Sequence, residues 1–118
     1  MEQSDGAIGA PVYVAGSFVK RLRGLFAPIP DNAVLIIVPC SSIHTFGMKA
    51  EIDIAFFSYE GEVLDAHMGL RPWRVCRCPE AMGVVERFSR IDDGPDSWWS
   101  PGDRMTLGFK RNEEANDR

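Results

Sequence analysis

Residues 52–68 read IDIAFFSYEGEVLDAHM, and this stretch decides the fold. Residues 52–59 and residues 62–68 stand on either side of Glu60-Gly61. A two-residue loop that ends in Gly favours the primed turns that join antiparallel strands. The stretch therefore predicts a β-hairpin.

The register of this hairpin follows if Tyr59 pairs with Glu62. One face then carries the pairs Phe57/Leu64, Ala55/Ala66 and Asp53/Met68, and the other carries Ser58/Val63, Phe56/Asp65 and Ile54/His67. The first face is the more apolar, so we expect it to look into the core.

Further elements are expected on both sides of the hairpin. Ser17 can cap a short helix over residues 17–25, which Pro28 and Pro30 stop. Residues 34–38 read as a strand covered on both faces, with Pro39 at its end or edge. Shorter strands are expected at residues 74–78, 83–88 and 104–109. The pattern predicts a mainly β fold, a compact antiparallel sandwich or barrel with one short N-terminal helix.

Length and composition favour one globular domain. The chain has 118 residues, of which 45% are hydrophobic, so its core needs neither metal nor disulfide to form. We expect a flexible N-terminus at residues 1–10, the domain at residues 11–110 and a flexible tail at residues 111–118. No cofactor is expected.

Charge and hydropathy limit the classes of partner. The net charge is −4 and the cations are spread along the chain, which argues against nucleic acid. No apolar run approaches the ~20 residues of a membrane helix, so we expect a soluble protein without membrane contact. The start lacks a secretory signal, which favours the cytoplasm unless a leader was removed. Three cysteines, Cys40, Cys76 and Cys78, are an odd count and favour reduced thiols.

Six short motifs follow one another through most of the chain. They are RLRGL at 21–25, HTFGMK at 44–49, IDIAF at 52–56, EGEVL at 60–64, VVE at 84–86 and Gly102-Asp103. Their combination and order resemble domain-of-unknown-function family 192. The resemblance implies a compact, mainly antiparallel β domain of jelly-roll type and brings no reaction, cofactor or substrate. Residues 87–103, RFSRIDDGPDSWWSPGD, depart from the family pattern.

Asp53 is the most diagnostic candidate, because its predicted position ends an apolar face, where an unpaired charge is costly. It either pairs with an Arg such as Arg21 or Arg23, or accepts backbone N–H groups, or forms the acidic wall of a pocket. His44 could project into the same region and act with Asp53 as an acid-base couple, or be held by structural hydrogen bonds. His67 is expected to be exposed.

A polar cleft at the open end of the hairpin is the predicted site. Its candidate lining residues are Arg23, His44, Lys49, Asp53 and Glu86, although Glu86 also fits a structural salt bridge. A zinc site of Cys40, His44, Cys76 and Cys78 is disfavoured by spacing, as is Cys40 acting as a nucleophile with His44. No metal site is therefore predicted.

The aromatic residues outside the clearest strands allow two interpretations. Trp73, Trp98 and Trp99 either plug one end of the fold or form a contact patch. Phe46 and Met48 are expected to pack in the core.

The leading functional hypothesis is a small binding or accessory domain with an unknown small molecule or protein as partner. The alternatives are an enzyme, a hydrolase or isomerase that uses His44 and Asp53, and a protein-interaction module that uses Trp98 and Trp99.

Overall fold

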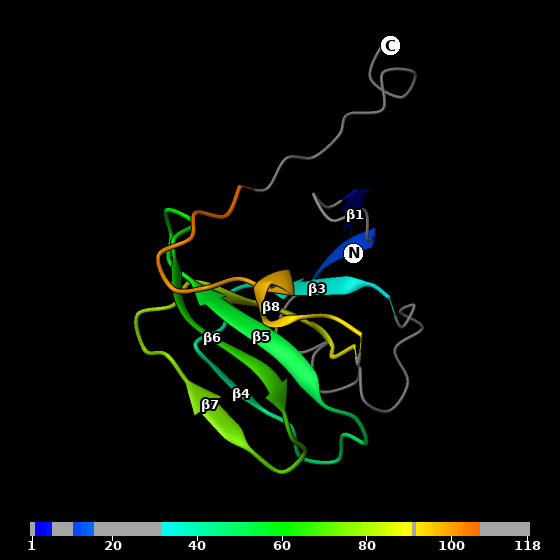
Figure 1. Cartoon of the computed structure of the whole chain (residues 1–118). Coiled ribbons are helices and arrows are strands. Elements are labelled where there is room, and N and C mark those ends of the chain that lie inside the picture. The colour runs from blue at the N-terminus through cyan, green and yellow to red at the C-terminus, as the bar shows by residue number, and fades with distance from the viewer. Residues whose placement is uncertain (1, 6–10, 16–31, 91, 107–118) are drawn as a thin grey trace.

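The computed structural model describes residues 2–5, 11–15, 32–90 and 92–106 (Figure 1). Six strands form one sheet in the order β1(Glu2–Asp5), β2(Pro11–Ala15), β3(Val34–Ile37), β8(Gly83–Phe88), β5(Ile52–Phe57) and β6(Val63–Leu70). A second sheet contains β4(Ser42–His44) and β7(Val75–Arg77). The mainly β class predicted from the sequence is confirmed.

The large sheet is mixed, so the expectation of an entirely antiparallel fold is wrong at one place. β2 and β3 pair in parallel, from Val12 with Val34 to Ala15 with Ile37, whereas the other strand pairs are antiparallel. Parallel neighbours need a crossover of roughly a dozen residues or more. The stretch between Ala15 and Val34 is long enough to provide one. A strand at residues 2–5 also stands within the segment expected to be a flexible N-terminus.

Helix is scarce in the part of the chain that the structure describes. The single helical element there is the short 3-10 turn η1(Pro95–Ser97), and none of the described helices is long and apolar enough to cross a membrane. The helix expected at residues 17–25 lies outside the described residues.

Both faces of the large sheet are covered. On one face, Ala55, Phe57 and Val85 pack with Trp98 and Met105 from the segment at residues 92–106. On the other face, the core includes Ile43 of β4 and Cys78, which follows β7, together with these members of the large sheet: Leu35, Ile37, Ile54, Phe56 and Val84. Figure 1 shows the 92–106 segment above β5 and the two-stranded sheet below it. All six residues of β5 are buried as a result.

The predicted hairpin register is confirmed in the middle of the hairpin. The observed partners include Ala55/Ala66, Phe56/Asp65 and Ile54/His67, as expected. At the closed end, however, Phe57 pairs with Val63 rather than with Leu64. The register shifts because the loop has three residues instead of two.

Gly61 is the residue that lengthens this loop. The N–H of Ser58 donates to the carbonyl of Glu62 at 2.8 Å, and the N–H of Gly61 donates to the carbonyl of Ser58 at 2.9 Å. Gly61 has a φ of 90°, so it takes the left-handed position that follows a turn in three-residue hairpin loops. Val63 consequently joins the cluster around Phe57, and Leu64 packs on the opposite face.

The open end of the hairpin has a second irregularity. Ile52 pairs with Leu70, while Ile54 pairs with His67, so Met68 and Gly69 together stand opposite Asp53. Gly69 has a φ of 68°, and this bulge turns its N–H toward the Asp53 carboxylate. All six residues of β5 are buried, so both of its faces lie in the core, whereas we expected only the face that carries Asp53 to do so.

The remaining strand predictions are also resolved. β3, β7 and β8 fall within the ranges expected for them, and β3 ends before Pro39. At the last predicted strand, the structure has one bridge between Arg104 and Glu62, and residues 107–109 lie outside the described part.

Candidate functional site

Asp53 is buried beside an arginine. Asp53 and Arg87 are direct partners on β5 and β8, and the Nε of Arg87 donates to Oδ2 of Asp53 at 2.8 Å. Their side chains are 1% and 2% exposed, respectively. A buried carboxylate requires such a partner, so the structural interpretation of Asp53 fits this geometry. The partner is Arg87, whereas Arg21 and Arg23 lie outside the described residues.

Two more donors occupy the second carboxylate oxygen of Asp53. Gly69 N–H donates to Oδ1 at 2.9 Å, and the hydroxyl of Ser89 donates to the same atom at 2.5 Å. The three donors come from β6 (Gly69), from β8 (Arg87) and from the residue that follows β8 (Ser89). Asp53 therefore joins three segments at one point of the sheet.

Arg87 extends this network to the 92–106 segment. Its Nη2 donates to Oγ of Ser97 at 3.1 Å and lies 3.3 Å from Oδ2 of Asp93. Its guanidinium carbon stands 4.6 Å from the centre of the Trp98 ring. Sequence reasoning missed Arg87, because its position opposite Asp53 depends on the pairing of β5 with β8, and no local signal indicates that pairing.

The structure does not bring His44 and Asp53 together. His44 is exposed on β4, and β4 packs on the sheet face that carries Ile54 and Phe56. Asp53 belongs to the opposite face, with Ala55 and Phe57, because side chains alternate along a strand. The large sheet thus separates the two groups of the expected acid-base couple.

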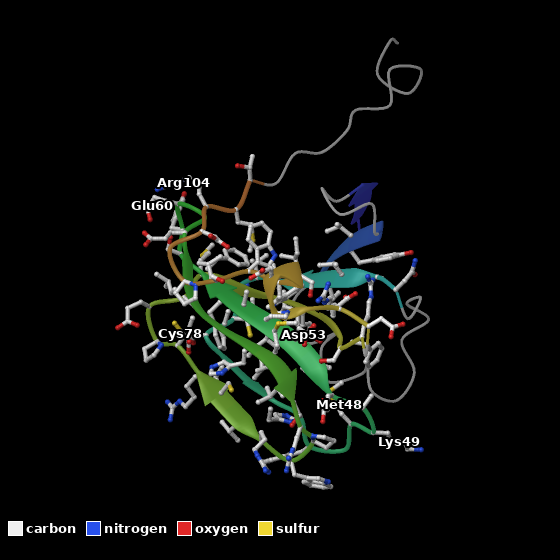
Figure 2. All side chains as sticks on the ribbon, viewed as in Figure 1. Met48, Lys49, Asp53, Glu60, Cys78 and Arg104 are labelled. Atoms are coloured by element: carbon white, nitrogen blue, oxygen red, sulfur yellow. The ribbon has the colours of Figure 1, made fainter. Side chains whose placement is uncertain are left out.

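The other cleft candidates also point in different directions. Glu86 is fully buried and pairs with Ile54, on the face opposite to that of Asp53. Lys49 is exposed and extends away from the body of the protein, whereas Asp53 lies inside it (Figure 2). Arg23 lies outside the described residues. The expected five-residue cleft is therefore not assembled by the residues that the structure describes.

Trp98 and Trp99 belong to the core rather than to a contact patch. Trp98 is 7% exposed, and its Nε1 donates to the carbonyl of Ile54 at 2.8 Å. Trp99 is half-buried and packs against the same cluster. These contacts favour packing over a contact patch, and they lie on a face of the large sheet rather than at one end of the fold.

The exposed tryptophan is Trp73, at the end of a row of three rings. Trp73 is 66% exposed and Phe46 is 48% exposed. The Phe46 ring lies 5.4 Å from that of Trp73 with an interplanar angle of 27°, and 4.9 Å from that of His44 with an angle of 34°. We call His44, Phe46 and Trp73 the aromatic row.

The expectation that Phe46 packs in the core is wrong, because alternation continues beyond β4. Ile43 and Thr45 point inward and are buried, so His44 and Phe46 point outward. Met48 packs against the core, as expected.

Thr45 holds the segment that carries Trp73. Its hydroxyl donates to the carbonyl of Arg71 at 2.7 Å and accepts from the N–H of Arg74 at 2.8 Å. The Thr45 backbone bonds to Arg74 and Trp73 as well, at 2.9 and 3.2 Å. Trp73 has a φ of 65°, an unusual conformation for a bulky side chain, and such strain persists where surrounding contacts impose it.

Four basic side chains belong to the segments that carry the aromatic row. Residues 39–50 and 69–78 contain Lys49, Arg71, Arg74 and Arg77. Acidic groups lie near them, because the Glu51 carboxylate lies close to Gly69, and Asp65 is near enough to Cys76 to raise its pKa. All four cations are exposed. We call the aromatic row and these four residues the open-end surface, since the row lies beside the start of β5 and the end of β6. Arg77 lies farther along β7, toward the side where Met82 bonds to Phe57 at the other end of β5.

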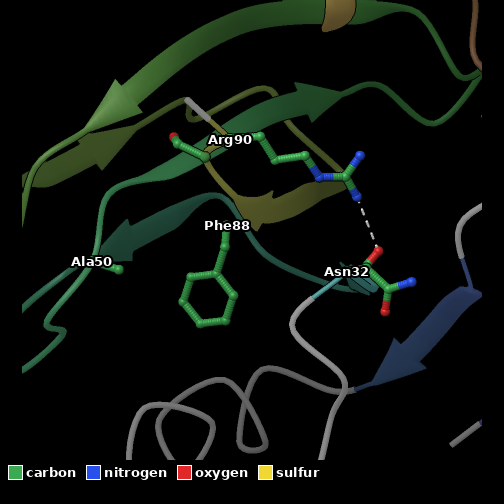
Figure 3. A pocket seen from close by; sticks show the side chains of 5 residues that line it. Asn32, Ala50, Phe88 and Arg90 are labelled. Atoms are coloured by element: carbon green, nitrogen blue, oxygen red, sulfur yellow. Dashed lines mark hydrogen bonds between the residues drawn. The ribbon is translucent and has the colours of Figure 1, made fainter. Parts of the chain in front are cut away.

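A cavity of about 520 Å³ lies near the same end of the large sheet (Figure 3). Its described walls are Asn32, Ala50, Phe88, Ser89 and Arg90. Nη2 of Arg90 donates to the Asn32 carbonyl at 3.2 Å, and the Ser89 hydroxyl is engaged with Asp53. No predicted cleft residue is among these described walls.

Cys40, Cys76 and Cys78 form no disulfide with one another. Burial raises the pKa of Cys76, and Asp65 adds to this effect. Burial also raises the pKa of Cys78, to which Glu80 and Asp65 contribute. Within the described ranges, no three or more His, Cys, Asp or Glu side chains gather in a way that could hold a metal ion.

Comparison with known proteins identifies relatives by sequence. The sequence pattern of domain-of-unknown-function family 192, described as "Uncharacterized ACR", matches residues 2–89. A UPF0127 protein of Pyrococcus abyssi is 36% identical over 69 residues, which are 54% of this chain and 58% of that protein. A UPF0127 protein of Pyrococcus horikoshii is 38% identical, over 54% of this chain and 59% of that protein. The chain therefore spans about three fifths of these curated relatives.

Two solved structures share the fold. A protein of unknown function from Novosphingobium aromaticivorans superposes with a TM-score of 0.62 at 15% identity, over 89% of this chain and 82% of its own. A putative transcription regulator from Sinorhizobium meliloti gives 0.60 at 16% identity, over 88% and 89%. At these identities the likeness concerns the fold alone.

Proposed function

This chain belongs to domain-of-unknown-function family 192, and we propose that it is a small binding domain whose ligand site is the open-end surface. The observation that carries the proposal is the aromatic row. Three neighbouring rings lie against one another on the outside of the protein, with Phe46 and Trp73 largely exposed. Exposed aromatic groups that are held in place mark interaction sites more often than scattered apolar residues do.

The rigidity of the surface supports binding. Thr45 is fully buried and bonds to three residues of the segment 71–74, so the position of Trp73 is imposed before a ligand arrives. A preorganised site loses less conformational entropy when it binds. Trp73 has a strained φ of 65°, which the surrounding hydrogen bonds impose. Because such strain is concentrated at functional sites, it supports a role for Trp73 in binding.

The proposed site lies at the open end of the hairpin, as the predicted cleft does, but the two sets of residues differ. His44 and Lys49 remain part of the proposal, and Phe46, Trp73 and the three arginines join them. Asp53 and Glu86 leave it because they are buried. Turnover by a His44–Asp53 couple is disfavoured, since the two side chains belong to opposite sides of the sheet. We also propose the jelly-roll arrangement that the family resemblance implies.

The experiment is a thermal-shift screen of metabolites and short peptides. A specific ligand raises the Tm of the folded protein in a concentration-dependent way. We expect the shift to disappear in the double variant Phe46→Ser/Trp73→Ser. The matched control is Tyr59→Ser, which removes an 82% exposed ring from the closed end of the hairpin. Equal shifts in both variants would place the ligand elsewhere and overturn the proposal.

A further inference from the structure

The open-end surface carries four exposed cations on a protein whose net charge is negative. The chain has a net charge of −4. Among the described residues, ion pairs involve His67, Arg87 and Arg90, and none includes Lys49, Arg71, Arg74 or Arg77. The guanidinium of Arg74 reaches back to the Trp73 carbonyl, with Nη1 at 3.4 Å. A cation therefore stands beside the backbone of the residue that carries the most exposed ring of the row.

The small sheet continues this surface. His44 pairs with Val75 and Ser42 pairs with Arg77, and these four side chains are exposed on the outer side of β4 and β7. Their inward neighbours, Ile43 and Cys76, pack against the core. The surface thus extends from Arg77 along two strands to Phe46 and Trp73.

We propose that the open-end surface binds single-stranded nucleic acid, with an unstacked base against Trp73 and backbone phosphates on Arg71 and Arg74. This inference rests on the proposed function and names its ligand class. Stacking of bases on aromatic side chains, combined with cations along the backbone, is how proteins hold single strands without reading their sequence. Arginine suits both partners, because its planar guanidinium binds phosphate and stacks on rings.

Charge complementarity decides in favour of an anionic partner. Nucleic acid was not expected as a partner because the cations are dispersed along the chain, but four exposed cations fall within residues 39–50 and 69–78. The ring geometry then favours bases over anionic lipid. The Phe46 and Trp73 rings are stacked at 27°, and the 66% exposure of Trp73 leaves room for a further ring at the end of the row.

The test is fluorescence anisotropy with labelled oligothymidylate and oligouridylate of about ten nucleotides at low salt. We expect a Kd on the order of micromolar, weakening as salt rises, and weaker binding to a duplex, whose bases have no free face. Trp73→Ala should weaken binding roughly tenfold or more. Tyr59→Ala, an exposed ring at the closed end, should leave it unchanged.

The cations are tested by the double variant Arg71→Gln/Arg74→Gln. Thr45 bonds to the backbone of both residues, so these substitutions leave its hydrogen bonds in place. The slope of log K against log salt should fall by about 0.7 for each phosphate that the variant no longer neutralises. Arg104→Gln, which lies at the far end of the hairpin beside Glu60, is the control (Figure 2). Urea unfolding of each variant checks that the fold is intact.

Four results would overturn the inference. They are no binding of either oligonucleotide, binding that Trp73→Ala does not weaken, equal affinity for duplex, and binding to phosphatidylserine vesicles in place of oligonucleotides. The proposed function has a separate outcome. If another ligand from the thermal-shift panel binds and Phe46→Ser/Trp73→Ser abolishes its effect, the binding surface stands and only the nucleic-acid inference fails.

Discussion

Asp53 and Arg87 stand directly opposite each other on β5 and β8, and a 2.8 Å hydrogen bond joins Nε of Arg87 to Oδ2 of Asp53 inside the core. From the sequence alone, Asp53 is the most diagnostic candidate for a functional residue. In the folded chain it holds the sheet together, because Gly69 and Ser89 occupy its other oxygen. Both carboxylate oxygens of Asp53 accept hydrogen bonds within the protein, so we assign Asp53 a structural role.

Breaking this pair should be costly. Arg87→Met leaves the buried carboxylate of Asp53 without its cation, and we expect a loss of about 3–5 kcal/mol in the free energy of unfolding. Asp53→Asn should also destabilise, and the two effects should combine to less than their sum. Urea unfolding of the double-mutant cycle measures this coupling. Arg90→Met is the control, because Arg90 is 39% exposed and its Nη1 is 3.9 Å from Asp93. It should cost less than about 1 kcal/mol, and a comparable loss in both arginine variants would contradict the assignment.

Thr45 provides a second test, since its hydroxyl bridges Arg71 and Arg74. Thr45→Val keeps the shape of the side chain but leaves the N–H of Arg74 and the carbonyl of Arg71 without this partner. We expect a loss of roughly 1–3 kcal/mol. Thr45→Ser retains the hydroxyl and should retain most of the stability. Chemical denaturation compares the three proteins, and hydrogen exchange at Arg74 should accelerate in the Val variant alone.

The hairpin loop depends on Gly61 for two reasons that can be separated. Its φ is 90°, and a Cβ added there would lie 2.5 Å from the Met105 carbonyl oxygen. Gly102 has a similar φ of 94° but nothing within 4 Å of an added Cβ. Gly102→Ala should therefore cost only the conformational term, about 1–2 kcal/mol. Gly61→Ala should cost roughly 1–3 kcal/mol more, because the backbone of residue 105 must move. Equal losses in thermal or urea unfolding would show that the close approach of Met105 is unimportant.

The cysteine thiols should make stability depend on pH at the alkaline end. Burial raises the pKa of both Cys76 and Cys78 in the folded protein, so the unfolded chain loses these protons at lower pH than the folded chain does. Their contribution is fully present below the ordinary thiol pKa and is lost as the pH rises through the folded values. Wild type should therefore lose more stability between neutral and alkaline pH than Cys76→Ala/Cys78→Ala. Urea unfolding at both pH values measures the difference, and parallel pH profiles would refute the prediction. In the native protein at neutral pH, a thiol reagent should modify these two cysteines slowly.

Local patterns were sufficient for much of the fold. Alternation in residues 52–68 and the glycine of the loop predicted the hairpin and its three central pairs, because side-chain period and turn chemistry are properties of neighbours in the chain. The same alternation, continued through Thr45, could also have shown that Phe46 is exposed. A loop of three residues rather than two was not predicted; in the structure the carbonyl of Gly61 also accepts a hydrogen bond from the N–H of Met105.

The sequence was sufficient to establish a mainly β domain, the hairpin at its centre and a buried Asp53 that requires a partner, because each follows from the spacing of residues close together in the chain. The folded structure was needed to identify Arg87 as that partner, to separate His44 from Asp53, and to bring His44 and Phe46 next to Trp73. Each of these depends on which strands become neighbours and which face of the sheet each layer covers. Such pairings result from burial summed over the whole core, and no local pattern records them.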